Sequence, residues 1–263
     1  MVSRFLKRFY AFLIFVFLYA PIVVLIVFSF NNSKSRAHWD GFTLKWYMEL
    51  FNDQQILKSL YYTIAVAVLS SLIATIIGTA AAIGINNMKS VSKKIMLNVN
   101  YLPVLNPDIV TGVALMSLFI FAKLNLGFLT MLLSHITFNI PYVILAVLPK
   151  LRQLPKDTTE AAMDLGATPS YALRKVILPQ IKPGIVTGAL MAFTMSIDDF
   201  VISFFTTGEG VSNLSITIYS MARRGINPKI NAISTLLFGV VLALLLIINK
   251  RSPETKLQGG SGL

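Results

Sequence analysis

Three aspartates lie in stretches of the chain that are otherwise almost entirely apolar: Asp108, and the adjacent pair Asp198 and Asp199. An aspartate inside a lipid bilayer costs about 2.5–3.5 kcal/mol on insertion scales, so three of them need a reason. The same stretches contain no lysine or arginine that could neutralise these carboxylates. A partly dehydrated cation is stabilised by negative charge and by aromatic faces. We therefore expect the three aspartates to line a path for a cation.

Each acid could instead have a structural role. Asp108 follows Pro107, where an aspartate can cap a helix. Asp198 and Asp199 would point about 100° apart on a helix, so only one of them would face the path fully. A protonated carboxyl group, or one paired with a lysine or arginine of another subunit, would also fit the sequence.

The composition indicates a membrane protein. Of the 263 residues, 55% are hydrophobic and 13% are charged, and the mean hydropathy is +0.71. Soluble domains usually carry about 25% charged residues. The chain has no cysteine, which excludes disulfides, thiolate metal sites and cysteine nucleophiles. We predict neither a metal site nor a catalytic residue.

Six mainly apolar stretches are long enough to cross about 30 Å of hydrocarbon. They predict an all-α membrane protein with a single transmembrane domain over residues 1–250, followed by a flexible tail at 251–263. The first stretch is expected to be an uncleaved anchor. The predicted spans are 9–30, 60–85, 96–122, 128–149, 184–205 and 231–248.

The net charge of +12 is explained by where the basic residues lie. All 23 lysines and arginines fall outside the predicted spans. Fifteen lie in the N-terminal tail, the loops 86–95 and 150–183 and the C-terminal tail, against eight on the opposite side. The positive-inside rule then places both termini in the cytoplasm. The charge therefore sets the topology and does not indicate a nucleic-acid partner.

Local sequence places the acids within the membrane. Pro103 and Pro107 predict that the third span is interrupted next to Asp108, and broken helices are tolerated where they line a cavity. The fifth span would run outward, with Asp198 roughly 21 Å from its inner end. His135 is the only histidine in a predicted span. We expect a hydrogen-bonded core histidine, with a proton relay or a substrate contact as the alternative.

The loop 150–183 predicts a helix, a sharp turn and a second helix that project into the cytoplasm. Polar side chains at 157–159 can cap a helix over 160–165, and Gly166 suits the left-handed position that ends it. Thr168 can cap the second helix, with Pro169 at its first position. One face of this helix would be apolar, with Leu173, Val176 and Ile177. Pro179 and Pro183 would end the helix before the fifth span.

The same loop resembles the EAA loop of ABC importer permeases. The family pattern is EAA-x3-G-x9-I-x-L-P, and this chain departs from it only in having Val176 in place of the isoleucine. The resemblance implies the fold of type I ABC importer permeases, with a coupling helix that docks into a cytoplasmic ATPase. The docking positions would be Glu160, Ala161, Ala162 and Gly166.

Further segments resemble the permease subunits of spermidine/putrescine importers: 39–47, 106–110, 134–142 and 196–200. This resemblance implies a bacterial inner-membrane subunit that imports polyamines by alternating access. It also implies four kinds of partner: a second homologous permease, two ATPase subunits, a periplasmic polyamine-binding protein and the lipid bilayer. The chain has no G-x-x-x-x-G-K-[ST] phosphate loop. We therefore expect no enzyme activity and no cofactor in this chain, with ATP and Mg²⁺ on the partner ATPase.

The first outer loop predicts a short amphipathic helix capped by Thr43. Its apolar face would carry Leu44, Tyr47, Met48 and Phe51. The tryptophans of this loop, Trp39 and Trp46, suit anchoring at the membrane interface or docking of a binding protein.

Three alternative functions are compatible with parts of the sequence. An ABC importer could carry ferric iron, another cation, an oligopeptide or another small solute. The acids alone would also fit a proton-coupled secondary transporter, which leaves the EAA loop unexplained. An intramembrane aspartyl protease needs a G-x-G-D segment, which neither Asp108 nor Asp198 provides.

Overall fold

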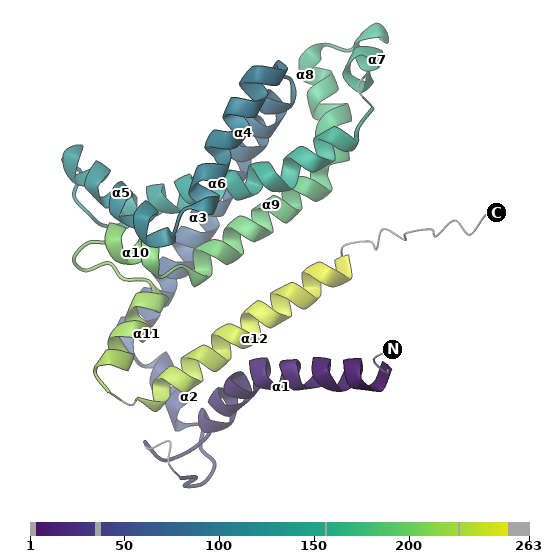
Figure 1. The fold of residues 1–263 in the computed structure, drawn as a ribbon. Coiled ribbons are helices and arrows are strands. Elements are labelled where there is room, and N and C mark those ends of the chain that lie inside the picture. Colours follow the sequence, from purple (N-terminus) through teal and green to yellow (C-terminus); the bar gives the residue numbers. More distant parts are fainter. Residues whose placement is uncertain (1–3, 35–37, 156, 226, 252–263) are drawn as a thin grey trace. The chain divides into compact units, whose positions relative to one another are not determined.

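The computed structural model describes residues 4–34, 38–155, 157–225 and 227–251. Its helices fall into two compact units, residues 1–54 with 220–263, and residues 55–219. Within the described residues, the β interactions amount to one isolated antiparallel bridge, between Asn31 and Phe42. The prediction of an all-α chain is therefore confirmed (Figure 1). The predicted tail lies outside the described residues apart from Arg251, which ends the last helix.

The first unit contains α1 (Arg4–Phe28), α2 (Lys45–Phe51) and α12 (Pro228–Arg251), and α12 contacts both of the others. The short α2 buries Trp46 and Leu50. The indole Nε1 of Trp46 donates to the backbone oxygen of Asn31 at 2.7 Å. At the start of α12, Lys229 lies 3.4 Å from Glu49 and 3.3 Å from Asp53. The Lys229–Glu49 contact therefore links α12 to α2.

Thr43 bonds the first residue of α2, although the N-cap position itself is Leu44, and most of the predicted apolar face of α2 does not pack within the chain. The backbone N–H of Lys45 donates to Thr43 Oγ1 at 3.1 Å. Leu44, Met48 and Phe51 are exposed, and Tyr47 is half-buried. The buried face is the one that carries Trp46 and Leu50, because the Trp46 indole finds a backbone acceptor there.

The second unit is built around α3 (Gln54–Asn86), α6 (Phe128–Gln153) and α9 (Leu178–Asp198). Glycines let these helices approach closely, as small residues commonly do between helices in membranes. A Cβ atom on Gly78 of α3 would lie 2.7 Å from the Val143 side chain, and one on Gly188 of α9 would lie 3.2 Å from the Val143 Cα. Both neighbouring helices therefore pack against α6 at Val143, which is fully buried.

The third predicted span is broken where the sequence predicted it. Helix α4 (Ser90–Leu105) contains Pro103, and α5 begins at Asp108 and ends at Phe121. Asn106, between them, has an extended backbone with ψ 145°, as expected for a residue that precedes proline. The two helices meet at an angle of 104°. Residues 96–122 therefore do not form one straight span.

The predicted end of the second loop helix is wrong. Helix α8 (Pro169–Ala172) continues through the π-helical turn η1 (Leu173–Ile177) into α9, and the apolar helix runs without a stop to Asp198. Pro179 lies in the first turn of α9, directly after the π-helical turn, and Pro183 lies inside α9. A proline inside a regular helix clashes with an earlier carbonyl group and lacks the N–H that would bond it. The wider π-helical turn accommodates both defects.

The fifth predicted span is also divided. Helix α9 ends at Asp198, and α10 covers Val201–Thr206. Helix α11 (Leu214–Arg223) then follows a loop. Within the described residues, four helices are long and apolar enough to cross a membrane, and the α4–α5 pair gives a possible fifth crossing. The stretch Pro228–Ala243 of α12 is apolar but shorter than a span. A count of six spans remains a prediction.

Candidate functional site

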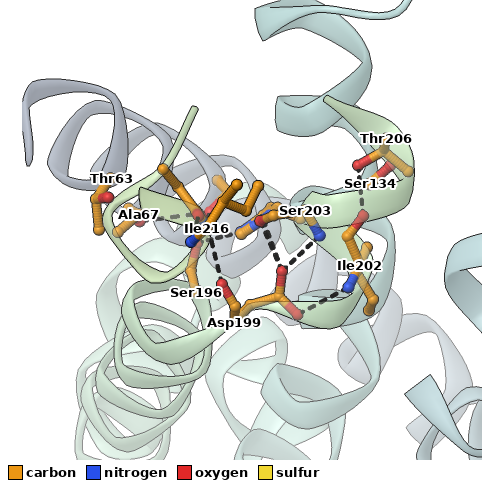
Figure 2. Close-up of polar contacts among 12 residues, drawn as sticks. Thr63, Ala67, Ser134, Ser196, Asp199, Ile202, Ser203, Thr206 and Ile216 are labelled. Carbon is orange, nitrogen blue, oxygen red and sulfur yellow. Dashed lines mark hydrogen bonds and ion pairs between the residues drawn. The ribbon is translucent and has the colours of Figure 1, made fainter. Parts of the chain in front are cut away.

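The backbone break between α9 and α10 is organised by Asp199. Its φ and ψ of −63° and 126° are extended, so the chain leaves the helix there. The carboxylate then turns toward the first turn of α10: Oδ1 accepts from the N–H of Ile202 at 3.2 Å, and Oδ2 accepts from the N–H and the hydroxyl of Ser203, both at 2.7 Å. Figure 2 shows this arrangement. Asp199 therefore satisfies N–H groups that a helix start leaves unpaired.

His135 of α6 lies against the same break. Its Nε2 is 2.8 Å from Ser203 Oγ and 3.4 Å from Asp199 Oδ2. Its Nδ1 is 2.5 Å from Oγ of Ser196, which lies in the last turn of α9. The side chains of His135 and Asp199 are 1% and 8% exposed. The prediction of a hydrogen-bonded core histidine is confirmed, because both ring nitrogens have partners.

The carbonyl group of Asp199 is satisfied as well. Asn213 Nδ2 donates to it at 2.8 Å, while Asn213 Oδ1 accepts from the N–H of Ile216 at 2.9 Å. Nonhelical backbone at membrane depth is tolerated only when its polar groups find partners inside the protein. The hydrogen bonds of Asp199 and Asn213 therefore stabilise the break between α9 and α10.

Asp198 differs from Asp199 in its exposure and its hydrogen bonding. It is the last residue of α9, its side chain is exposed, and within the described part of the chain it makes neither a hydrogen bond nor an ion pair. The two adjacent carboxylates therefore differ in environment: Asp199 is hydrogen-bonded within the chain, and Asp198 is exposed.

Asp108 is the second exposed carboxylate. It begins α5. Helix α5 packs on α10: a Cβ atom on Gly112 would lie 3.0 Å from the Phe205 ring. The tertiary structure therefore brings the helix that begins at Asp108 against the short helix that follows Asp199.

The EAA loop forms the predicted helix, turn and helix. Helix α7 runs from Thr158 to Asp164, Gly166 has a φ of +89°, and the Tyr171 N–H donates to Thr168 Oγ1 at 3.3 Å. The predicted side-chain cap of α7 by Asp157 is absent. Helix α7 buries none of its residues against the chain: Glu160 and Ala161 are exposed, and so is Leu165 beyond its end, at 90%.

Comparison with known proteins identifies the family. Residues 74–250 match the family described as "Binding-protein-dependent transport system inner membrane component". The chain belongs to this family. As a member, it is a membrane-embedded component of a transport system.

Similar full-length proteins are known. This chain is 37% identical over 263 residues to the spermidine/putrescine transport system permease protein PotC of Escherichia coli strain K12, covering 100% of this chain and 99% of that protein. It is 38% identical over 237 residues to the putrescine transport system permease protein PotI of the same strain, covering 86% and 83%.

Solved structures share the fold. A chain of the bacterial alginate ABC transporter, in complex with its alginate pentasaccharide-bound periplasmic protein, has a TM-score of 0.70 and 18% identity, covering 96% of this chain and 97% of that one. A chain of the inward-facing MetNI methionine ABC transporter has a TM-score of 0.61 and 19% identity, covering 74% and 93%.

Reasoning from the sequence missed Ser196, Ser203 and Asn213. One local signal was available: an aspartate followed by a serine four residues later can cap a new helix, so Asp199 and Ser203 could have marked the break. The pairing of both with His135 joins residues more than 60 positions apart, and no local pattern predicts it.

Proposed function

We propose that this chain is the permease subunit of an ATP-driven importer that moves a polyamine such as spermidine or putrescine into the cytoplasm. The observation that carries the proposal is the exposed carboxylate of Asp198, which has no protein partner in the described structure. A polyamine ammonium group is the complementary ligand for such a carboxylate. The names of the similar permeases support the same substrate class.

The path would use Asp198 and Asp108 as its carboxylates. Both are exposed, and the predicted spans contain no lysine or arginine to compete with the substrate. Asp199, which was predicted to line the path, would instead act by holding the break next to Asp198, because its carboxylate is bonded within the chain.

The remaining parts of the machine would follow the family plan. The chain would cross the inner membrane six times with both termini in the cytoplasm and pair with a second permease. Glu160, Ala161, Ala162 and Gly166 would dock an ATPase subunit, where ATP and Mg²⁺ would bind. A periplasmic binding protein would deliver the polyamine. Closure of two ATPases on ATP would then drive the path from inward-facing to outward-facing.

The test is uptake of labelled spermidine by the reconstituted complex, supplied with saturating binding protein. A charge-assisted contact is worth about 1.5–3 kcal/mol, or roughly ten- to a hundredfold. We expect Asp198→Asn to lower the uptake rate by about tenfold or more, and Asp108→Asn to lower it by a similar factor, while the complex still assembles. Wild-type uptake in both variants would refute the path, and uptake without ATP would refute the ATP-driven mechanism.

A further inference from the structure

His135 lies in the middle of a chain of hydrogen bonds that links four helices. On one side, its Nδ1 contacts Ser196 Oγ of α9, which lies 3.1 Å from Ser70 Oγ of α3. Ser70 in turn accepts from Nδ2 of Asn139, one turn further along α6, at 3.3 Å. On the other side, its Nε2 contacts Ser203 of α10. Every one of these side chains is buried.

The direction of the bonds toward α10 is fixed by Asp199. An ionised carboxylate only accepts hydrogen bonds, so the Ser203 hydroxyl donates its proton to Asp199. The Ser203 oxygen must then accept from His135, which places a proton on Nε2. On the other side of the ring, the Ser196 hydroxyl can donate to Nδ1 or accept from it. The imidazole therefore bridges the end of α9 and the start of α10 in either charge state.

This bridge sets the orientation of Asp198. Ser196 and Asp198 are two residues apart, so their side chains point about 200° apart around α9. Ser196 is 2% exposed and held by His135, and Asp198 is exposed. The following residue, Asp199, is held by Ile202 and Ser203. Asp198 is thus bracketed on both sides by residues that the His135 network fixes.

We propose that His135 is a positioning residue for transport: it latches α9 to α10 and thereby presents the Asp198 carboxylate to the substrate. This inference rests on the proposed role of Asp198 in a polyamine path. His135 itself does not reach the substrate, because its side chain is 1% exposed and both nitrogens are occupied. A latch of this kind acts on transport only through Asp198.

The experiment measures spermidine uptake and spermidine transported per ATP hydrolysed, in the reconstituted complex with saturating binding protein. His135→Leu removes both bonds of the latch. Ser203→Ala, which loses a single oxygen atom, removes the bond from His135 to α10 together with the bond that this hydroxyl donates to Asp199. A reacting or binding group displaced by about 1 Å can lose up to a hundredfold in rate. We expect either variant to lower uptake and the transported ratio by roughly five- to tenfold. His135→Gln, which keeps a donor toward Ser203, should recover part of the loss.

The decisive comparison repeats His135→Leu and Ser203→Ala in an Asp198→Asn background. If the latch acts through Asp198, neither substitution lowers uptake further there, because residues that act as one unit are not additive. An equal further loss in that background would mean a purely structural role and would overturn the inference. If the complex with His135→Leu does not assemble, the comparison is made with Ser203→Ala alone.

Thr79→Val is the matched control. The Thr79 hydroxyl is buried in α3 without a hydrogen-bond partner in the described structure, so its removal should leave uptake unchanged. Normal uptake in His135→Leu and Ser203→Ala, alongside defective uptake in Asp198→Asn, would overturn the latch and leave the proposed function standing. Normal uptake in Asp198→Asn would overturn the Asp198 path itself.

Discussion

At the scale of single residues, a glycine decides how closely two helices approach, because its side chain is one hydrogen atom and not the methyl group of alanine. Gly78 of α3 is buried, and a Cβ atom there would lie 2.7 Å from the Val143 side chain and 3.2 Å from the Ile140 backbone oxygen. Neither neighbour can move aside freely, since Val143 is itself enclosed between α3 and α9. The contact between α3 and α6 therefore depends on glycine.

Gly78→Ala is expected to destabilise the protein by about 1–3 kcal/mol, the usual cost of overpacking a core. The measurement is the midpoint of thermal unfolding of the purified chain in detergent. Gly84→Ala is the matched control on the same helix, because it is exposed and has no atom within 4 Å of the added Cβ. Alanine there should raise stability by up to about 1 kcal/mol. Equal midpoints for the two variants would contradict the packing argument.

The adjacent Asp198 and Asp199 have the same side chain but different surroundings. Both are acidic and adjacent, and the sequence could not say which faces a ligand. Asp199 is taken by two backbone N–H groups and a hydroxyl, whereas Asp198 has no partner among the described residues. The end of α9 falls between the two residues, which leaves one carboxylate bonded within the chain and the other exposed.

At the scale of elements, α7 contacts α8 and the π-helical turn η1, but this packing leaves most of its surface exposed. None of its residues is buried, and the chain turns sharply after it at Gly166. A seven-residue helix is too short to be stable alone in water. A short helix with most of its surface exposed would gain stabilisation from a partner, which fits the proposed docking of an ATPase.

Ala161→Trp is expected to separate the ATPase from the membrane subunits, because a large ring on the exposed face of α7 would prevent close helix packing. Co-purification of the ATPase with the membrane subunits measures this, and we expect a loss of tenfold or more. Val91→Trp is the control: Val91 is 71% exposed on α4, outside the EAA loop, and should not affect co-purification. Full retention of the ATPase by Ala161→Trp would contradict docking through α7.

Proline had different consequences in different elements. Pro107 ends a helix as predicted, because the residue before it takes an extended backbone. Pro179 and Pro183 were predicted to stop a helix and do not. A π-helical turn precedes Pro179 and accommodates it, and α9 continues through Pro183. The break at Asp199 contains no proline, so it was not predicted.

At the scale of the whole molecule, the distribution of charge and apolar length predicts the membrane topology. Because the sequence has no cysteine, single cysteines can be introduced without background. Phe42 is 69% exposed in the first outer loop, and Val91 is 71% exposed at the start of α4. The two positions are predicted to lie on opposite sides of the membrane.

A membrane-impermeant maleimide should label Phe42→Cys in intact spheroplasts and Val91→Cys only after permeabilisation. The cysteine-free parent is the control for background labelling. Labelling of both positions in intact spheroplasts, or the reverse pattern, would contradict the cytoplasmic placement of the termini.

The sequence by itself determined the class of the molecule. Apolar stretches of sufficient length, lysines and arginines confined to the loops, and the spacing of Glu160, Ala161, Ala162 and Gly166 are local or compositional features. Such features can be read without knowing which segments touch. The all-helical class, the turn at Gly166 and the break before Asp108 followed from them.

Only the tertiary structure decided which acid is bonded inside the chain. The hydrogen bonds of His135 join residues 61 and 68 positions apart, and Ser70 joins Ser196 across 126 positions. Partners this distant depend on how α3, α6, α9 and α10 pack, which is set by many weak contacts summed over the unit. A sequence pattern with a period of a few residues cannot carry that information.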